Sequence, residues 1–170
     1  MQGSVDVSGG VIGGRQARRR ITELIRAARI CTLTTISLDG RLVGRPMTLQ
    51  RTEFDGQLWF FAYAGSATAR QARVNPEVEL SLHDPQAQVW ASITGSARDD
   101  PDQARAERLW HPGLAPWFPD GPATAGLTLI AVHPTAVRCW DARGGQVELI
   151  GPVGAASSGG SSADHREDGY

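Results

Sequence analysis

The sequence predicts one mainly β domain, an antiparallel β-barrel with flanking α-helices. Three observations lead to this fold class: six to eight short segments carry strand patterns, tight-turn dipeptides link several of them as hairpins, and no repeated strand–helix–strand unit is present. A chain of 170 residues fits one such domain with a sizeable core. We place the domain at residues 15–151, after a flexible arm at 1–14 and before a Gly- and Ser-rich tail at 152–170 that we expect to be disordered.

The first predicted element is an amphipathic helix over residues 15–29. Its apolar positions recur with the helical period, and they are Ala17, Ile21, Leu24, Ile25 and Ala28. The opposite face holds most of the charges, including the basic run from Arg18 to Arg20. We interpret that run as a solvated helix face rather than as a nucleic-acid or lipid site.

Strand patterns follow at 31–37, 42–52, 57–62, 77–83, 88–97, 127–132, 136–140 and 146–150. The first is rich in Thr and β-branched residues, and the fourth and fifth alternate apolar with polar residues. The dipeptides Asp39-Gly40 and Asp55-Gly56 are typical of hairpin turns, so the first three strands are predicted to form two consecutive hairpins. A turn is also predicted at His133-Pro134.

Two shorter helices interrupt the strands. The helix at 67–74 has Ser66 as its expected N-cap, and it ends at Asn75-Pro76 because the residue before a proline is biased away from the helical conformation. The helix at 101–110 has Pro101 in its first turn. A loop rich in Pro, Gly and aromatic residues follows at 111–122.

Composition argues against several function classes. The net charge of −1 gives no basic field that would recruit nucleic acid. All 17 basic residues are Arg, so covalent attachment of pyridoxal phosphate to a lysine is excluded. Cys31 and Cys139 do not make a disulfide framework, and we expect both to be reduced and buried. Because no signal-like segment and no run of about 20 apolar residues is present, we expect a cytoplasmic protein that does not enter a membrane.

Motifs for other chemistries are missing. None of the four histidines forms a close metal-ligand pair with another His or a Cys, so no metal site is expected. No G-x-S-x-G and no G-x-G-x-x-G after a strand occurs, which argues against acyl transfer and against a Rossmann dinucleotide site. His111, in the Trp-rich loop, is the one histidine that we consider for proton transfer.

The stretch between Arg45 and Arg70 carries groups that suit a phosphorylated, flat, aromatic cofactor. Arg45, on a predicted strand, can make a charge-assisted contact to phosphate. The aromatic strand Trp59-Phe60-Phe61 offers flat apolar walls, and the helix start at Ser66 offers free N–H groups and a positive dipole end. The same residues also fit an ordinary fold, with Arg45 at the surface, the aromatic strand in the core and Ser66 only capping a helix.

Seven short motifs occur in an order that is fairly specific. They are Arg45-Pro46-Met47, Phe60-Phe61-Ala62, Asn75-Pro76, Gln88 with its alternating strand, Leu109-Trp110-His111-Pro112, Trp117-Phe118-Pro119-Asp120-Gly121 and Cys139-Trp140-Asp141. Together they resemble the pyridoxamine 5′-phosphate oxidase-like flavoproteins, the FMN-binding split barrels, and most closely their branch around general stress protein 26. The similarity covers about residues 20–142.

The resemblance implies an FMN-binding split β-barrel that forms a homodimer with flavin at the subunit interface. The cofactor-binding residues that it implies are Arg45, Pro46, Met47, Thr48, Phe61, Ala62, Ser66, Thr68, Arg70 and Gln88, with Gln88 reaching in from the partner subunit. Trp110, His111 and Trp117 are expected to form the wall on the substrate side.

Two basic positions of the family are replaced in this chain. The family's phosphate-binding lysine falls on Thr68, and a second basic position on the Arg-Pro-Met strand falls on Gln50. Arg70 or Arg73 is expected to compensate. The Arg-Leu-x-Pro ending of true pyridoxamine phosphate oxidases is absent, so vitamin B6 oxidation is not expected.

The leading hypothesis is an FMN-dependent oxidoreductase of this class. Hydride transfer would run through flavin N5, with a nicotinamide or a small organic molecule as donor. One alternative is a stress-related protein that binds flavin without turnover, which the missing lysine positions favour. Another is a reductase that uses the deazaflavin F420 on the same barrel, because the acidic tail of F420 suits an Arg-rich rim. FMN is preferred over F420 and FAD.

Overall fold

The computed structural model describes residues 11–12, 14–50, 52–141 and 147–150, so the predicted tail and most of the predicted arm lie outside the described residues. The strands are Val11–Ile12 (β1), Ile30–Ile36 (β2), Leu42–Thr48 (β3), Leu58–Tyr63 (β4), Glu77–Asp84 (β5), Val89–Asp100 (β6), Leu127–Asp141 (β7) and Val147–Ile150 (β8). The helices are Gly14–Ala28 (α1), Ala67–Val74 (α2) and Gln103–Leu109 (α3), with short 3-10 turns at Pro112–Leu114 and Gly121–Ala123.

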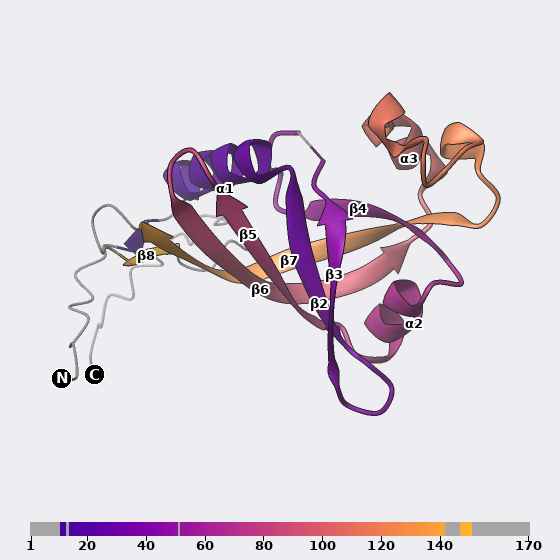
Figure 1. Ribbon diagram of the computed structural model, residues 1–170, viewed down its shortest axis with the longest axis horizontal. Coiled ribbons are helices and arrows are strands. Elements are labelled where there is room, and N and C mark those ends of the chain that lie inside the picture. Colours follow the sequence, from indigo (N-terminus) through magenta and orange to yellow (C-terminus); the bar gives the residue numbers. More distant parts are fainter. Residues whose placement is uncertain (1–10, 13, 51, 142–146, 151–170) are drawn as a thin grey trace, which may run out of the picture.

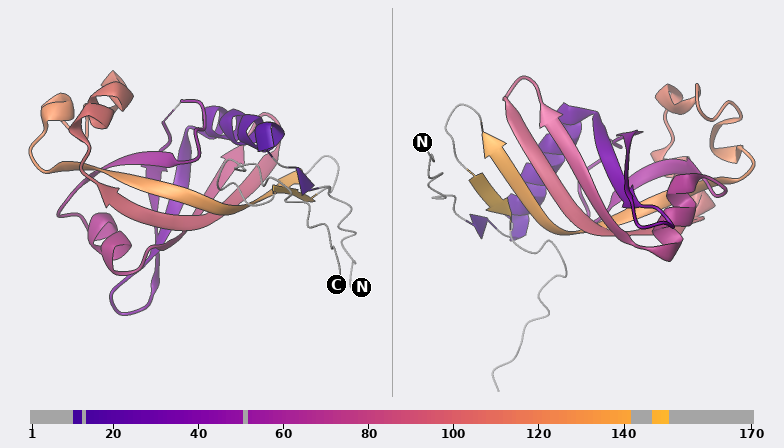
Figure 2. Two further views of the ribbon diagram at one scale, coloured as in Figure 1. Left: turned by 180° about the vertical axis from the view of Figure 1, so that it is seen from behind. Right: turned by 60° about the horizontal axis from the view of Figure 1, so that its bottom comes forward.

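The described strands form one curled sheet. Its order is β1-β8-β7-β6-β5-β2-β3, and β4 lies beside β7. Every pair is antiparallel except β1 with β8, which the sequence did not predict. Figure 1 shows the three helices at separate positions around this sheet, and Figure 2 shows how strongly the strands curl. The predicted mainly antiparallel split barrel is confirmed.

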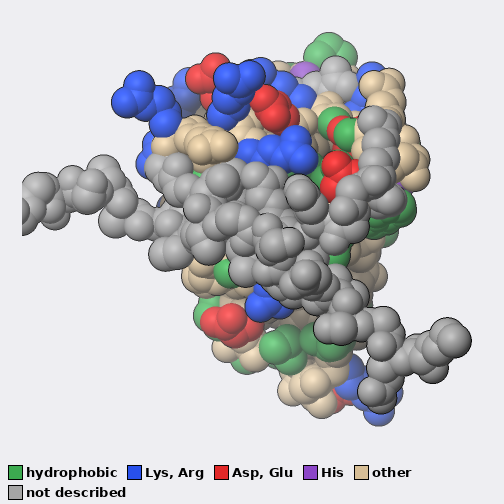
Figure 3. Space-filling view, turned by 90° about the vertical axis from the view of Figure 1, so that its left-hand side faces the viewer, with side chains coloured by type: hydrophobic (Ala, Val, Ile, Leu, Met, Phe, Trp, Pro, Cys, Tyr) green, Lys and Arg blue, Asp and Glu red, His purple; other side chains and the backbone are tan. Residues whose placement is uncertain are grey.

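The helix α1 buries the face that the helical period predicts. Ile21, Leu24 and Ile25 are 0–3% exposed and belong to the main core. The outer face is solvated, and Arg19 pairs with Glu23 one turn later at 3.0 Å. Figure 3 shows basic and acidic side chains next to one another near the upper edge of the molecule. This mixture of charges fits a solvated helix face.

Two apolar clusters fill the fold, and β4 joins them. Because neighbouring side chains of a strand point to opposite sides, Phe60 enters the main cluster while Trp59 and Phe61 enter a second, smaller one. The second cluster also takes Leu114 and Phe118 from the loop after α3. This arrangement places a short aromatic strand between the barrel core and a covering loop.

The first predicted hairpin is confirmed, and the second is wrong. β2 and β3 pair around a turn in which Gly40 has a φ of 80°, a left-handed conformation that suits glycine. β4, however, pairs with β7 and not with β3. The segment between them is anchored elsewhere: Phe54 is 5% exposed, and its N–H donates to Thr22 Oγ1 of α1 at 3.0 Å. The chain therefore leaves β3 at Thr48 instead of extending to residue 52 and turning back.

The turn predicted at His133-Pro134 is also wrong, because both residues lie inside the single strand β7. The register between β6 and β7 shifts between Thr94 and Gly95, where Thr135 of β7 is left without a pairing residue, so that Gly95 faces Pro134. A Cβ on Gly95 would lie 2.3 Å from the carbonyl oxygen of His133. Only glycine permits this close approach, and the resulting bulge lets one long strand replace the two shorter predicted strands.

Smaller differences concern element ends. α2 spans the predicted residues, and its N-cap is Ser66, whose Oγ accepts from the N–H of Ala69 at 3.2 Å. α3 begins later than predicted, with Asp102 as N-cap, so Pro101 lies before the helix and not in its first turn. Gln88 lies in the turn before β6 with a φ of 57°, and not on the strand.

Candidate functional site

A cavity of about 340 Å³ opens between β3, β4, the start of α2 and the loop after α3. We call it the neutral cavity. It is lined by Ile30, Pro46, Met47, Thr48, Phe61, Ala62, Tyr63, Ser66, Thr68, Leu114, Trp117 and Phe118. Among the described residues, no charged side chain lines it. The sequence predicted Pro46, Met47, Thr48, Phe61, Ala62, Ser66 and Thr68 as cofactor residues, and the fold brings all of them to this one space.

The strand β3 forms an open wall of the neutral cavity because it lies at the end of the sheet order. Pro46 has no N–H to give to a further strand, which is the position in a sheet where proline is tolerated. The backbone of Met47 and Thr48 therefore borders the cavity at a free sheet edge. A bound molecule can approach the main chain there.

Aromatic side chains form the opposite wall. The rings of Tyr63 and Phe118 have centroids 5.1 Å apart, and those of Phe61 and Phe118 have centroids 6.0 Å apart. The hydroxyl of Tyr63 donates to the carbonyl oxygen of Trp117 at 2.9 Å, which fixes the loop against β4. Trp117 itself is 60% exposed. The wall is thus aromatic and largely apolar, with rings tilted by 38° and 53° to one another, and the loop can exclude water from what lies against it.

The start of α2 gives the neutral cavity its polar end. Ser66 uses its hydroxyl to cap the N–H of Ala69, and Thr68 is 6% exposed with its side chain in the cavity wall. The remaining N–H groups of the first turn have no partner within the helix, and they carry the positive end of its dipole. This end of the cavity suits an anionic group.

Arg45 lies outside the lining of the neutral cavity, but it reaches the same helix. Its guanidinium donates to Thr35 Oγ1 at 2.7 Å and to Gln71 Oε1 at 3.0 Å, and Thr35 Oγ1 in turn donates to Gln71 Oε1 at 2.5 Å. Gln71 follows Thr68 by one turn of α2, so both lie on the same helix face. Burial lowers the pKa of Arg45, and no carboxylate contributes to that change. Among the described residues, the guanidinium of Arg45 therefore has neutral hydrogen-bond partners and no ion pair.

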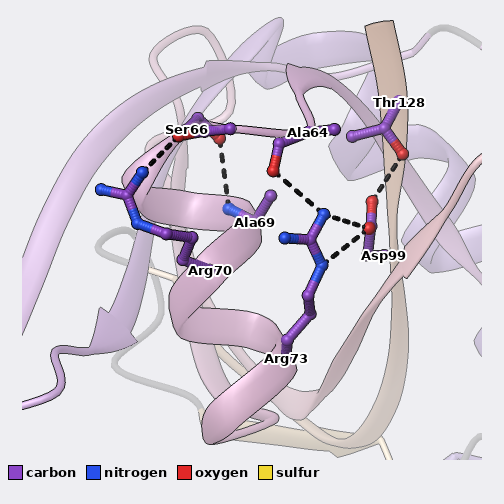
Figure 4. Close-up of polar contacts among 8 residues, drawn as sticks. Ala64, Ser66, Ala69, Arg70, Arg73, Asp99 and Thr128 are labelled. Atoms are coloured by element: carbon purple, nitrogen blue, oxygen red, sulfur yellow. Dashed lines mark hydrogen bonds and ion pairs between the residues drawn. The ribbon is translucent and has the colours of Figure 1, made fainter. Parts of the chain in front are cut away.

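The two arginines that were expected to replace the missing lysine are oriented differently (Figure 4). Arg73 binds Asp99 through Nε at 2.9 Å and Nη2 at 2.5 Å, and Asp99 also accepts from Thr128 at 2.5 Å. Arg70 donates to the carbonyl oxygen of Gly65 and is exposed. Neither side chain lines the neutral cavity. Arg73 is already neutralised by an acid, whereas Arg70 lies beside the helix start without an ion pair in the described part of the chain.

Gln88 also lies apart from the neutral cavity. Its Nε2 donates to the carbonyl oxygen of Pro85 at 2.7 Å within the β5–β6 turn. Trp110 packs in the second cluster, edge-on to Phe61 with a centroid distance of 5.7 Å. His111 lies in a different cavity.

This second space has a volume of about 660 Å³ and shares Ile30, Thr48 and Trp117 with the neutral cavity. We call it the basic cavity. Its remaining lining residues are Arg29, Leu49, Gln50, Thr52, Arg108, Leu109, His111 and Gly113. Among the described residues, no Asp or Glu lines it. Of the three residues expected on the substrate side, His111 and Trp117 meet here and Trp110 does not.

Sequence reasoning missed several residues of this region. Tyr63, Leu114 and Phe118 line the neutral cavity, and Thr35 and Gln71 hold Arg45. The spacing of Thr68 and Gln71 on one helix face was a usable signal. The loop was anticipated only in part: Trp117 was expected at the site, whereas Leu114 and Phe118 were not, because their place beside Phe61 depends on tertiary packing.

Further observations limit other functions. No helix in the described ranges is long and apolar enough to span a membrane. Within the same residues, no group of three or more His, Cys, Asp or Glu side chains is arranged to hold a metal ion. Cys31 is buried, and burial raises the pKa of its thiol to about 12, so it is not a nucleophile at neutral pH.

Several solved structures resemble this fold. General stress protein 26 from Bacillus anthracis aligns with a TM-score of 0.63 and 20% identity, over 72% of this chain and 92% of that one. A protein related to general stress protein 26 from Clostridium acetobutylicum aligns with a TM-score of 0.67 and 14% identity, over 81% and 96%. The general stress FMN/FAD binding protein from Xanthomonas citri aligns with a TM-score of 0.64 and 22% identity, over 90% and 100%. At these identities the likeness shows a shared fold.

A search of curated proteins found no match. A family model, in contrast, matches residues 16–164, which include every described strand and helix except β1 and the first residues of α1. That model describes the proteins termed pyridoxamine 5′-phosphate oxidase like. The chain therefore belongs to the pyridoxamine 5′-phosphate oxidase-like family.

Proposed function

We propose that the neutral cavity binds FMN and that the protein is a flavin-dependent oxidoreductase. The observation that carries this proposal is an uncharged aromatic cavity whose polar end lies at the start of α2. Arg45, which has no acidic partner among the described residues, donates to Gln71 one turn further along that helix. A cofactor with a flat apolar ring and a phosphate at one end matches this arrangement of apolar and polar groups. The family, and the name FMN/FAD binding protein of the similar structure from Xanthomonas citri, support a flavin at this site.

The residues present fit this cofactor. Small-molecule sites span about 300–1,000 Å³, and the neutral cavity lies within that range at about 340 Å³. Phe61 and Ala62 would border the ring and the ribityl chain, and the edge backbone at Met47 and Thr48 would meet polar atoms of the ring. Ser66 and Thr68 would hold the phosphate together with the first-turn amides, with Arg45 supplying positive charge along α2.

Bound FMN supplies an acceptor that takes a hydride at N5 from a nicotinamide or a small organic donor. The chain's own residues bind, orient and shield. The β3 edge and the aromatic wall would border the flavin ring, and the Tyr63–Trp117 hydrogen bond holds the loop that would exclude water from it. No side chain need act as an acid or base in this account, because placement carries most of the catalysis.

The test is anaerobic mixing of the FMN-loaded protein with NADH or NADPH while the flavin absorption is followed. Bleaching that reverses when air is admitted would support an oxidoreductase. If neither nucleotide and none of a panel of small organic donors bleaches the bound flavin, the result would contradict turnover.

That second result would favour the alternative of a flavin-binding protein without turnover. One observation supports this alternative: the family's phosphate lysine is replaced by Thr68, and no described cation lines the neutral cavity. Weak phosphate binding is compatible with flavin storage, but it does not by itself prevent electron transfer. Proposals for F420 or FAD are tested in the same titration by replacing FMN with either cofactor.

We also propose a homodimer, with Gln88 reaching the flavin of the partner subunit. Trp90 and Trp140 support an interface on the outer face of the sheet, because they oppose each other across β6 and β7 and are 44% and 41% exposed. Large exposed aromatic pairs of this kind are typical of protein interfaces. Light scattering would measure the mass in solution, and Trp140→Arg is expected to shift it toward the monomer. A wild-type mass equal to that of a single chain would contradict the dimer.

A further inference from the structure

We propose that the basic cavity binds a small organic anion that carries a hydrogen-bond donor, such as a hydroxyl or amino group, beside its charge. The cavity adjoins the neutral cavity through Ile30, Thr48 and Trp117. That this anion is the substrate rests on the proposed function. That it binds rests only on the charge, burial and hydrogen bonding of the basic cavity itself.

The charge comes from Arg29 and Arg108. Some surface arginines of the described chain pair with acids, such as Arg41 with Asp39 at 3.0 Å and Arg105 with Asp102 at 3.3 Å, whereas Arg70 does not. Neither Arg29 nor Arg108 has an ion pair within the described residues, and the cavity they line contains no described acid. Arg108 is near enough to Asp102 to help lower the pKa of that carboxyl. Because Asp102 does not line the cavity, two guanidinium groups around this space still favour an anion there.

The backbone position of Arg29 is fixed, and its side chain is exposed. It has a φ of 61°, which is uncommon for a residue with a side chain. Its N–H donates to the carbonyl oxygen of Ile25 at 3.4 Å, and its carbonyl oxygen accepts from the N–H of Leu49 at 2.9 Å. Arg29 is thereby held between the end of α1 and the segment that follows β3. Arg108 comes from the last turn of α3 and also lines the cavity.

The requirement for a donor comes from Gln50. This residue is 5% exposed, and its Nε2 donates to the carbonyl oxygen of Thr48 at 3.3 Å. That bond fixes the orientation of the amide, because only the nitrogen can donate to a carbonyl. Its Oε1 is buried and has no hydrogen-bond partner. A buried acceptor without a partner is energetically unfavourable, so a ligand N–H or O–H that reaches Oε1 would be recognised.

The remaining walls suit an organic body rather than a bare ion. Leu49, Leu109 and Trp117 supply apolar surface. The ring of His111 lies against Gly113, where a Cβ would come within 3.0 Å of Cε1 and Nδ1. The glycine therefore leaves room for the imidazole beside the cavity, as a further polar group for the ligand.

Mandelate is a suitable probe, because it combines a carboxylate, a hydroxyl and an apolar ring. Phenylacetate lacks the hydroxyl, and mandelamide lacks the charge. We would measure the binding of all three by calorimetry, both to the FMN-loaded protein and to the protein without FMN. We expect mandelate to bind at least about tenfold more tightly than either analogue, because each lacks one of the two contacts.

Three variants assign the contacts. Gln50→Met is expected to remove the preference for mandelate over phenylacetate. Arg108→Gln is expected to remove most of the preference over mandelamide, and because Arg108 is exposed, this variant keeps the fold. Arg19→Gln, on the outer face of α1, is the matched control and should bind as the wild type does. Thermal melting of each variant checks its fold.

The outcomes separate this inference from the proposed function. Mandelate binding without FMN binding would support the anion site and contradict the flavin proposal. Equal affinities for the three probes, no saturable mandelate binding, or wild-type affinity in Arg108→Gln would overturn the inference. Displacement of FMN by mandelate would also overturn it, because the basic cavity would then belong to the cofactor site.

Discussion

The two cavities share a wall but differ in almost every chemical respect. The neutral cavity is lined by aromatic, apolar and hydroxyl side chains, whereas the basic cavity is lined by two arginines, a histidine and a buried amide. Thr48, where β3 ends, lies at their boundary. The comparison teaches that one sheet edge separates a place for a flat ring from a place for a small anion.

The difference has a structural origin. The neutral cavity is built mainly by regular elements, namely β3, β4 and the capped start of α2. The basic cavity is built by the segments that leave them: the residue after α1, the residues after β3 and the end of α3. Ring binding therefore depends on strand register, whereas anion binding depends on how connecting segments are anchored.

The largest expected effect concerns the charge behind the neutral cavity. Arg45→Ala should weaken FMN binding at least about tenfold, because a charge-assisted contact contributes about 1.5–3 kcal/mol. Arg70→Ala, at the same helix start but exposed, should change the affinity less than about threefold. Quenching of flavin fluorescence measures both. Unchanged affinity in Arg45→Ala would remove this arginine from the site.

A smaller effect is expected at the polar end of the neutral cavity. Thr68→Val removes a buried hydroxyl of similar shape, so FMN binding should weaken by about 1 kcal/mol, or roughly fivefold. Thr68→Ser keeps the hydroxyl and should bind within about twofold of the wild type. If valine binds FMN as well as threonine does, Thr68 does not contact the phosphate.

Gly113→Ala tests the basic cavity separately from the neutral cavity. The added Cβ would press on the His111 ring at 3.0 Å, so the wall of the basic cavity would shift. Mandelate binding should weaken by about twofold to fivefold while FMN binding stays unchanged. Calorimetry and fluorescence quenching on the same preparation check both. Equal losses for the two ligands would mean that the cavities do not act separately.

The smallest effect concerns pH. The N–H of Arg105 donates to Asp102 at the start of α3, and this bond holds the pKa of the carboxyl below its ordinary value. A lowered folded-state pKa gives stability that is present above the unfolded-state pKa and is lost as pH falls through the folded one. Asp102→Asn keeps a cap without a charge.

The stability difference between Asp102→Asn and the wild type should therefore fade as the pH falls from about 5 to about 3. Urea unfolding at a series of pH values measures it. A difference that is constant with pH would show that the charge of Asp102 contributes nothing.

Local signals predicted much of this fold. The period of α1, the Ser66 cap of α2 and the alternation in β5 are properties of neighbouring residues, and each is confirmed. The failures have a long-range cause. Asp55-Gly56 is a turn in sequence, but the burial of Phe54 beneath α1 sends the chain to β7. The bulge at Gly95, which keeps β7 continuous through Pro134, depends on a partner about forty residues away and had no local signal.

The prediction of the site also succeeded for local features and failed for those that depend on tertiary contacts. Residues on β3, β4 and α2 were identified from short motifs, and the fold assembles most of them. The partners of Arg45, the packing of Leu114 and Phe118 beside Phe61, and the unpaired oxygen of Gln50 depend on tertiary contacts, so no motif revealed them. The resemblance to a family supplied the cofactor, which residue types alone left open.

The most direct test of the account is the visible absorption spectrum of the purified protein as FMN is titrated in. The account predicts saturable binding with a shifted flavin spectrum in the wild type, because the ring moves from water to an apolar aromatic cavity. A spectrum identical to that of free FMN at every ratio would contradict the central claim that the neutral cavity is a flavin site.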